Sequence, residues 1–153
     1  MATVFTNGCF DILHPGHYQL LTYCRYLAAG DSVIVAIDAD TKVIRDKGRF
    51  RPYYNQEERR NLLMMLTTDG KLDARGFGNF LVDWVDIFDT DDELYRLIGK
   101  HKPDYIIKGA DWKGKTVIGS DLAQVHLAPT YFKDVFSTSA IERRILEKHR
   151  GLK

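Results

Sequence analysis

Cysteine is scarce in this chain and a long apolar run is missing, and each absence excludes a class of protein. The 153 residues contain only Cys9 and Cys24. Two cysteines are too few for a disulfide scaffold and too isolated for a zinc ribbon, so we expect reduced thiols with no catalytic role. No apolar stretch approaches the roughly 20 residues that cross a bilayer, and the N-terminus shows no basic-then-apolar signal pattern. We therefore expect a cytoplasmic protein without a membrane partner.

An overall excess of charge is also missing. The net charge is +1 and the pI is near 7.8, which does not favour a nucleic-acid partner. Charge is instead distributed locally: residues 42–60 hold seven basic and three acidic side chains, whereas residues 83–94 hold six acidic side chains and no basic one. A length of 153 residues with 44% hydrophobic content predicts one domain, 1–153, with a sizeable core.

Short apolar runs alternate with helical patterns along the whole chain. The strand-like runs are Ala2–Thr6, Ser32–Ile37, Trp84–Phe88, Tyr105–Lys108 and Val125–Leu127. This alternation predicts an α/β fold, with a Rossmann-like open parallel five-stranded sheet and helices on both faces. Helix starts are indicated by a capping side chain three residues before a glutamate, at Asn55 and Glu58, at Thr90 and Glu93, and at Ser139 and Glu142. Gly30 and Pro103 mark two helix ends.

Residues 6–17 place His14 and His17 between the first predicted strand and the first predicted helix. Gly8 lets the backbone approach a ligand, and Pro15 fits the first turn of a helix. The N-terminus of a helix favours anions, and two imidazoles that donate hydrogen bonds into the same space make a site suited to a polyphosphate. A zinc site is the main alternative, but the other histidines are scattered without a recognisable ligand spacing.

The segment from Asn7 to His17 resembles the signature loop of the HxGH nucleotidyltransferase superfamily, the cytidylyltransferase-like enzymes. This superfamily includes glycerol-3-phosphate cytidylyltransferase and the adenylyltransferase domain that makes ADP-heptose. Further resemblances are found at Lys47-Gly48, Arg51-Pro52, Glu58-Arg59, Lys108-Gly109-Ala110-Asp111, Asp111-Trp112-Lys113-Gly114-Lys115 and Ser137-Thr138-Ser139-Ala140-Ile141. Together they extend over nearly the whole chain.

The resemblance implies three groups of site residues. The catalytic residues are His14, His17 and Lys47. The nucleotide-binding residues are Asn7, Gly8, Cys9, Phe10, Asp11, Gly16, Lys108, Gly109, Asp111, Trp112, Ser137 and Thr138. The acceptor-binding residues are Arg51 and Arg59. Mg²⁺ is the expected cofactor, no residue is assigned as its direct ligand, and a homodimer is consistent with the family.

The residues themselves leave other readings open. Lys47 and Arg51 also fit a solvated loop, and Arg59 beside Arg60 also fits an exposed ion-pair face. Ser137 and Thr138 also fit helix caps, and these two roles are compatible. Trp112 is expected either to form a wall for the base or ribose or to pack in the interior. Residues 67–81 fit a lid, an oligomer contact or a surface loop, of which we favour the last.

The implied reaction is an in-line attack by an acceptor phosphate oxygen on the α-phosphorus of a nucleoside triphosphate, which releases pyrophosphate. The segments at residues 47–52 and 108–111 favour ATP with a heptose or other sugar 1-phosphate. The segment at residues 112–115 favours CTP with glycerol 3-phosphate, whereas residues 132–136 lack the arginine that the cytidylyltransferase pattern carries there. A non-catalytic nucleotide-binding module, a class I aminoacyl-tRNA synthetase fragment and pantetheine-phosphate adenylyltransferase are weaker alternatives.

Overall fold

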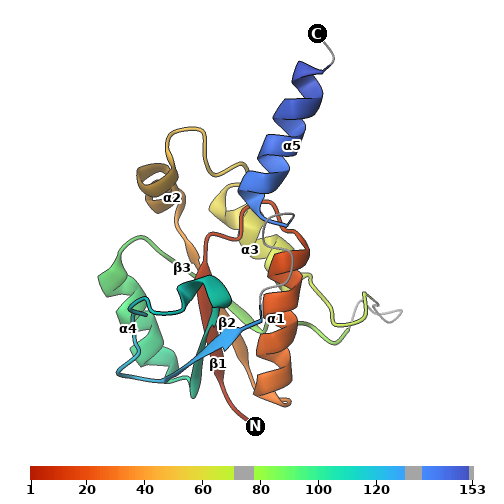
Figure 1. The fold of residues 1–153 in the computed structure, drawn as a ribbon. Helices are drawn as coiled ribbons and strands as arrows, with labels where there is room; N and C mark the ends of the chain where they lie inside the picture. The colour runs from red at the N-terminus through yellow and green to blue at the C-terminus, as the bar shows by residue number, and fades with distance from the viewer. Residues whose placement is uncertain (71–77, 130–135, 152–153) are drawn as a thin grey trace.

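The computed structural model describes residues 1–70, 78–129 and 136–151 and shows an α/β domain (Figure 1). Its strands are β1 (Val4–Gly8), β2 (Val33–Asp38), β3 (Trp84–Phe88), β4 (Tyr105–Gly109) and β5 (Gln124–Ala128). Its helices are α1 (Pro15–Ala28), α2 (Asp40–Lys47), α3 (Gln56–Met64), α4 (Asp91–His101), the short 3-10 helix η1 (Ala110–Trp112) and α5 (Thr138–Arg150). Neighbouring strands pair in parallel in the order β3-β2-β1-β4-β5. The predicted fold class is confirmed.

The strands lie within one or two residues of their predicted positions. The largest shift is at β1, which was expected to end at Thr6 and continues to Gly8. The Thr6 hydroxyl is fully buried and donates to the carbonyl of Ile107 at 2.8 Å. This bond satisfies a polar group inside the sheet. The strand is longer than predicted because Asn7 and Gly8 continue the pairing with Ala36 and Ile37 of β2.

Helices cover both faces of the sheet. On one face, Leu21 of α1 and Leu63 of α3 pack against Val35 and Ile37 of β2. On the other face, two buried side chains of α4 (Leu94 and Ile98) pack with Phe5, Ile34 and Ile106 from three strands. Each strand therefore contributes apolar side chains to two layers, as expected for a parallel sheet.

Two of the three predicted helix starts are confirmed. Asn55 and Glu58 form a reciprocal capping box, and Thr90 caps α4 by accepting from the N–H of Glu93. The third prediction is wrong by two residues: α5 is capped by Ser137, whose hydroxyl accepts from the N–H of Ala140 at 3.1 Å. Glu142 is consequently not a capping partner.

The long segment at residues 67–81 is fastened at its two ends. Thr67 pairs with Phe80 in an isolated antiparallel bridge, and the Tyr18 hydroxyl of α1 donates to the carbonyl of Thr68 at 2.9 Å. Leu81 is fully buried. Residues 71–77 lie outside the described part of the chain, so the expectation of a surface loop there stays a prediction. No described helix has the length and apolar character to cross a membrane.

Candidate active site

A cavity of about 770 Å³ opens where β1, β4 and β5 end and where α1 and α5 begin. In Figure 1, the first turn of α5 lies beside the first turn of α1, and the rest of α5 projects away from the sheet. In parallel sheets ligands bind beyond the carboxyl ends of the strands, and this cavity is at that edge. It is lined by Cys9, Phe10, Asp11, His14, Gly16, His17, Gln19, Leu20, Lys47, Phe50, Arg51, Gly109, Asp111, Trp112, Ala128, Pro129, Phe136, Ser137, Thr138, Ser139 and Glu142.

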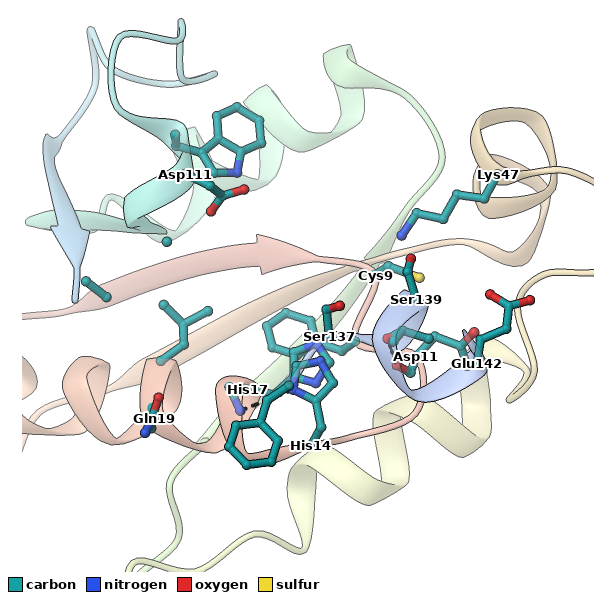
Figure 2. Close-up of a pocket in the computed structure, with 18 of the residues that line it drawn as sticks. Cys9, Asp11, His14, His17, Gln19, Lys47, Asp111, Ser137, Ser139 and Glu142 are labelled. Atoms are coloured by element: carbon teal, nitrogen blue, oxygen red, sulfur yellow. Dashed lines mark hydrogen bonds between the residues drawn. The ribbon is translucent and has the colours of Figure 1, made fainter. Parts of the chain in front are cut away.

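The two histidines of the signature stack on one another at the start of α1 (Figure 2). Their ring centroids are 3.8 Å apart, and the ring centroid of Phe10 lies 5.1 Å from that of His17 in a tilted arrangement. His14 is the N-cap of α1, because its Nδ1 accepts from the N–H of Gly16 at 3.1 Å. A neutral His14 therefore carries its hydrogen on Nε2, from which it can donate to a ligand.

Both imidazoles are held in the neutral form. Burial lowers the pKa of His14. Burial lowers the pKa of His17 to about 3, and the charges of His14 and Lys47 act in the same direction while Asp11 opposes them. The Nδ1 of His17 is buried without a hydrogen-bond partner among the described residues, so Nε2 is the ring nitrogen that can reach a ligand. The pair thus acts as hydrogen-bond donors rather than as cations at neutral pH.

Asp11 links three segments that are far apart in the sequence. Its carboxylate accepts from Arg51 Nε at 2.9 Å and from the backbone N–H groups of Tyr53 and Tyr54 at 2.9 and 3.0 Å. Its carbonyl accepts from the Thr138 hydroxyl at 2.7 Å. Burial acts to raise the pKa of Asp11, but these backbone and guanidinium donors outweigh it and lower the pKa. Asp11 therefore lines the cavity as a charged positioning group whose oxygens are already occupied.

Arg59 does not lie in the cavity, contrary to the expectation that it contacts the acceptor. Its side chain is fully buried, with Nε and Nη1 donating to the carbonyls of Tyr54 and Cys9 at 3.0 and 2.7 Å. Its Nη2 donates to Asp40 at 2.7 Å. The guanidinium faces inward because it satisfies two loop carbonyls and one carboxylate at once. Arg59 therefore stabilises the loop after β1 from the interior of the protein.

Lys47 brings free positive charge to the cavity. It is the last residue of α2, it is exposed, and no hydrogen bond or ion pair ties it to the described residues. Figure 2 shows its side chain extending from α2 into the cavity. Neighbouring basic groups are already paired, Lys42 with Asp46 and Arg45 with Asp89. Of the local basic excess, Lys47 is thus available to an anion.

Trp112 lines the cavity, and Lys108 lies beside it in an adjoining side pocket. The Lys108 ammonium lies 4.2 Å from the centroid of the indole ring and 3.3 Å from the carbonyl of Asn7. Burial lowers the pKa of Lys108 to about 8, against the opposing charges of Asp38 and Asp111. Three of the residues predicted to bind the nucleotide line this side pocket and not the main cavity, namely Asn7, Gly8 and Lys108. Gly109, Asp111 and Trp112 line both.

The start of α5 completes the cavity with hydroxyl groups and helix N–H groups. Ser137 and Thr138 line the cavity, as predicted, and both also have structural roles, Ser137 as the cap and Thr138 as a donor to Asp11. The N–H groups of Thr138 and Ser139 have no partner within the helix, because the first turn of an α-helix provides none. Together with the helix dipole they favour an anion at this end.

Several lining residues were not predicted as site residues. Gln19 and Leu20 of α1, Phe50 of the 48–52 loop, Ala128 and Pro129 after β5, and Phe136, Ser139 and Glu142 at α5 all line the cavity. The sequence could have indicated Gln19 and Leu20 as site residues, since they follow the signature on the first turns of α1. Phe50 could also have been predicted, as an apolar residue between Arg49 and Arg51. Glu142 was not predicted as a site residue, because its spacing from Ser139 indicated a capping pair instead.

Comparison with known proteins shows the family to which the chain belongs. The family described as cytidylyltransferase-like matches residues 5–144. The bifunctional protein HldE of Campylobacter concisus is 46% identical over 143 residues, which are 93% of this chain and 26% of that protein. The HldE of Helicobacter pylori strain HPAG1 is 39% identical over 147 residues, or 95% of this chain and 28% of that protein. The chain thus spans about a quarter of the length of these relatives.

A solved structure supports the fold independently. A lipopolysaccharide core biosynthesis protein from Thermoplasma volcanium superposes with a TM-score of 0.59 at 23% identity, covering 86% of this chain and 97% of that one. The family match and the HldE relatives support a nucleotidyltransferase. The chain belongs to the cytidylyltransferase-like family.

Proposed function

We propose that this nucleotidyltransferase transfers AMP from ATP to the phosphate of a sugar 1-phosphate, with a heptose 1-phosphate as the preferred acceptor. The observation that carries the proposal is the convergence of the stacked His14 and His17, the Lys47 ammonium and the first turn of α5 on one cavity. Donors from α1, α2 and α5 can surround a triphosphate there, and the proposed transfer needs no nucleophilic side chain. Positioning and charge stabilisation are the main tasks of an enzyme in phosphoryl-group chemistry.

In this proposal the triphosphate lies between the starts of α1 and α5. Nε2 of each neutral histidine donates to phosphate oxygens, and the Ser137 hydroxyl together with the N–H groups of Thr138 and Ser139 holds the outer phosphates. A phosphate oxygen of the acceptor attacks the α-phosphorus. The bond from the α-phosphorus to the bridging oxygen breaks, and the electron pair leaves with pyrophosphate. Lys47 neutralises the charge that develops on the oxygens of the α-phosphate.

Mg²⁺ remains the proposed cofactor. No group of three or more His, Cys, Asp or Glu side chains gathers as a metal site within residues 1–70, 78–129 and 136–151. Mg²⁺ commonly keeps several waters and is held through substrate phosphates with one or two carboxylates, and Asp111 is a lining carboxylate that suits this arrangement. When bound, the ion would supply charge neutralisation on the triphosphate.

The acceptor is proposed from the residues around Lys47. The segments at residues 47–52 and 108–111 resemble those of the heptose-phosphate enzymes, and the relatives at 39% and 46% identity bear the name bifunctional protein HldE. In this structure Lys47, Phe50 and Arg51 from the first of these segments line the cavity. Arg51 retains two terminal guanidinium nitrogens beyond the Nε that Asp11 uses, which suits an acceptor phosphate.

A second candidate reaction is the transfer of CMP from CTP to glycerol 3-phosphate. Trp112 favours it, since this residue lies in the segment that resembles the glycerol-phosphate enzyme and is contacted by both Lys108 and Lys115, at 4.2 and 5.5 Å from the ring centroid. The arginine that the cytidylyltransferase pattern carries before the last motif would fall at residues 132–136, of which 132–135 lie outside the described part of the chain.

The proposal is tested by measuring pyrophosphate release from each of the four ribonucleoside triphosphates with heptose 1-phosphate, hexose 1-phosphates, glycerol 3-phosphate, phosphocholine, phosphoethanolamine or phosphopantetheine, with Mg²⁺. We expect ATP with heptose 1-phosphate to give the highest kcat/KM. A response to CTP with glycerol 3-phosphate alone would replace the proposal with the second candidate. Nucleotide binding by calorimetry without any turnover would favour a binding module.

A further inference from the structure

Glu142 places a carboxylate in a cavity that otherwise attracts anions. It lies on α5, one turn beyond the hydroxyl-bearing start of the helix, and it lines the cavity with Lys47, Arg51 and Ser139 (Figure 2). A site built only for phosphates gains nothing from a negative charge there, because like charges repel across a partly desolvated space. Glu142 therefore marks a part of the cavity that suits a different chemical group.

The position of Glu142 is fixed by Tyr53. The Tyr53 hydroxyl donates to Oε1 of Glu142 at 2.6 Å, and the backbone N–H of Tyr53 donates to Asp11. The hydrogen bond to the charged carboxylate raises the pKa of Tyr53, so the phenol remains a donor at neutral pH. Glu142 is thus connected to the segment that carries Arg51, across 89 residues of sequence.

The second oxygen of Glu142 remains available. Within the described residues, Tyr53 is the hydrogen-bond partner of this carboxylate, and it uses Oε1 alone. Glu142 is partly buried and lines the cavity, and a carboxylate oxygen is a strong acceptor for a neutral donor such as a hydroxyl group. The neighbouring Ser139 hydroxyl, which is exposed and lines the cavity, adds a second group of matching chemistry.

We infer that Glu142 is a specificity residue that accepts a hydrogen bond from a hydroxyl group of the acceptor, and that Tyr53 positions its carboxylate for this contact. This inference rests on the proposed function, which supplies an acceptor with one phosphate and several hydroxyl groups. The phosphate binds the cationic side chains of Lys47 and Arg51, and the polyhydroxylated part of the molecule extends toward α5. Glu142 then favours hydroxylated acceptors over acceptors that are anionic or apolar at this position.

Binding of two probes tests the inference without any need for turnover. The dissociation constants of heptose 1-phosphate and of inorganic phosphate are measured by calorimetry for the whole chain in EDTA, which excludes bridging by a metal ion. We expect Glu142→Ala to weaken heptose 1-phosphate about tenfold or more, the scale of a hydrogen bond to a charged group. Inorganic phosphate should bind as well as before or more tightly, because it makes no hydroxyl contact and a repelling charge has been removed.

Tyr53→Phe should weaken heptose 1-phosphate by a smaller factor. The double variant should be no weaker than Glu142→Ala alone, since Tyr53 acts through Glu142. Tyr54→Phe is the matched control for the tyrosine, because Tyr54 is exposed to a similar extent, 42% against 46%, and only its backbone groups form hydrogen bonds among the described residues. Glu147→Gln is the control for the glutamate, on an exposed turn of the same helix. Both controls should leave the two affinities unchanged.

Two results would overturn the inference. One is an unchanged affinity of the folded Glu142→Ala variant for heptose 1-phosphate, and the other is an equal loss of affinity for both probes, which indicates damage to the phosphate site. Failure of the proposed function has a different signature. In that case the wild-type chain shows no pyrophosphate release with any sugar 1-phosphate, whatever Glu142 does to binding.

Discussion

His17 is the residue whose packing and protonation state matter most for the proposed chemistry. It stacks on His14 and packs against Phe10 in a tilted arrangement, and its ring is held in the neutral state by burial. A neutral imidazole donates a hydrogen bond without the solvation cost of a buried cation, so it is poised for charge that appears only during reaction. The packing that holds the ring also fixes the direction of its hydrogen bond.

We predict that His17→Ala lowers turnover by about 10²–10³-fold, the scale of one lost transition-state donor. The fold should survive, because the His17 side chain forms no hydrogen bond with the described residues and His14 caps α1. Steady-state kinetics beside circular dichroism measures both. Unchanged turnover in a folded variant would contradict the assignment of His17 to catalysis.

The depressed pKa of His17 also predicts a pH dependence of stability. The unfolded ring binds a proton near pH 6.5, whereas the folded ring does so only near pH 3. Between these values the unfolded state binds more protons, so the free energy of unfolding falls as the pH falls, by up to about 1.4 kcal/mol per pH unit for this one group. Denaturant unfolding of wild type and His17→Gln from pH 7 to pH 4 measures it. The slope should be shallower in the variant, and equal slopes would contradict the prediction.

At the scale of elements, the loop after β1 is held in place from two sides. Asp11 binds the 51–54 segment and the start of α5, and Arg59 of α3 holds the carbonyls of Cys9 and Tyr54. Segments from three parts of the chain are thereby fixed around the cavity by buried ionic groups. Buried charges of this kind are costly to break because the remaining partner is left unsatisfied.

We predict that Arg59→Ala lowers the free energy of unfolding by about 3 kcal/mol, because it strands Asp40 and two loop carbonyls. Arg60→Ala is the matched control. Arg60 is 42% exposed and its contact with Glu57 is 3.8 Å long, so its removal should change stability by less than about 0.5 kcal/mol. Urea unfolding distinguishes the two. A higher KM for the acceptor without any loss of stability in Arg59→Ala would instead restore the acceptor-binding role predicted from sequence.

The contrast between Arg59 and Lys47 shows what could be predicted from the sequence. The strand positions, the signature loop and two of the three predicted helix caps follow from local patterns of apolar residues, glycine, proline and capping side chains, and most of the expected residues line one cavity. Whether a charged side chain points into a cavity or into the interior depends on partners that are distant in sequence. Arg59 meets Cys9 across 50 residues, and Glu142 meets Tyr53 across 89, so no local pattern could reveal either contact.

At the scale of the whole molecule, the local excesses of charge are largely matched by internal pairing. The acidic segment at residues 83–94 supplies Asp83 to Arg25 and Asp89 to Arg45, and its last acids lie in the first turn of α4, where the helix dipole favours them. Many of these charged side chains therefore stabilise the fold and are not available to a ligand. The Lys47 end of the cavity is where positive charge remains available to a ligand.

The projecting part of α5 provides a test at this scale. Residues 143–151 are all exposed, and Figure 1 shows this end of the helix directed away from the sheet. We predict that deleting the chain from Glu147 onward changes the free energy of unfolding by less than about 1 kcal/mol and leaves turnover unchanged, since no buried contact is removed. Denaturation and light scattering measure the outcome. A large loss of stability together with a lower molecular mass would show that this helix packs on a second copy, in line with the homodimer that the family resemblance predicts.

Direct attack of the acceptor phosphate on the α-phosphorus is tested best by an isotope experiment. Heptose 1-phosphate carrying ¹⁸O on its phosphate is incubated with ATP, Mg²⁺ and the chain, and the products are followed by ³¹P NMR and mass spectrometry. We predict an ADP-linked sugar that retains all of the label, with unlabelled pyrophosphate released in equal amount. Label in the pyrophosphate, or ADP and orthophosphate as the products, would contradict it.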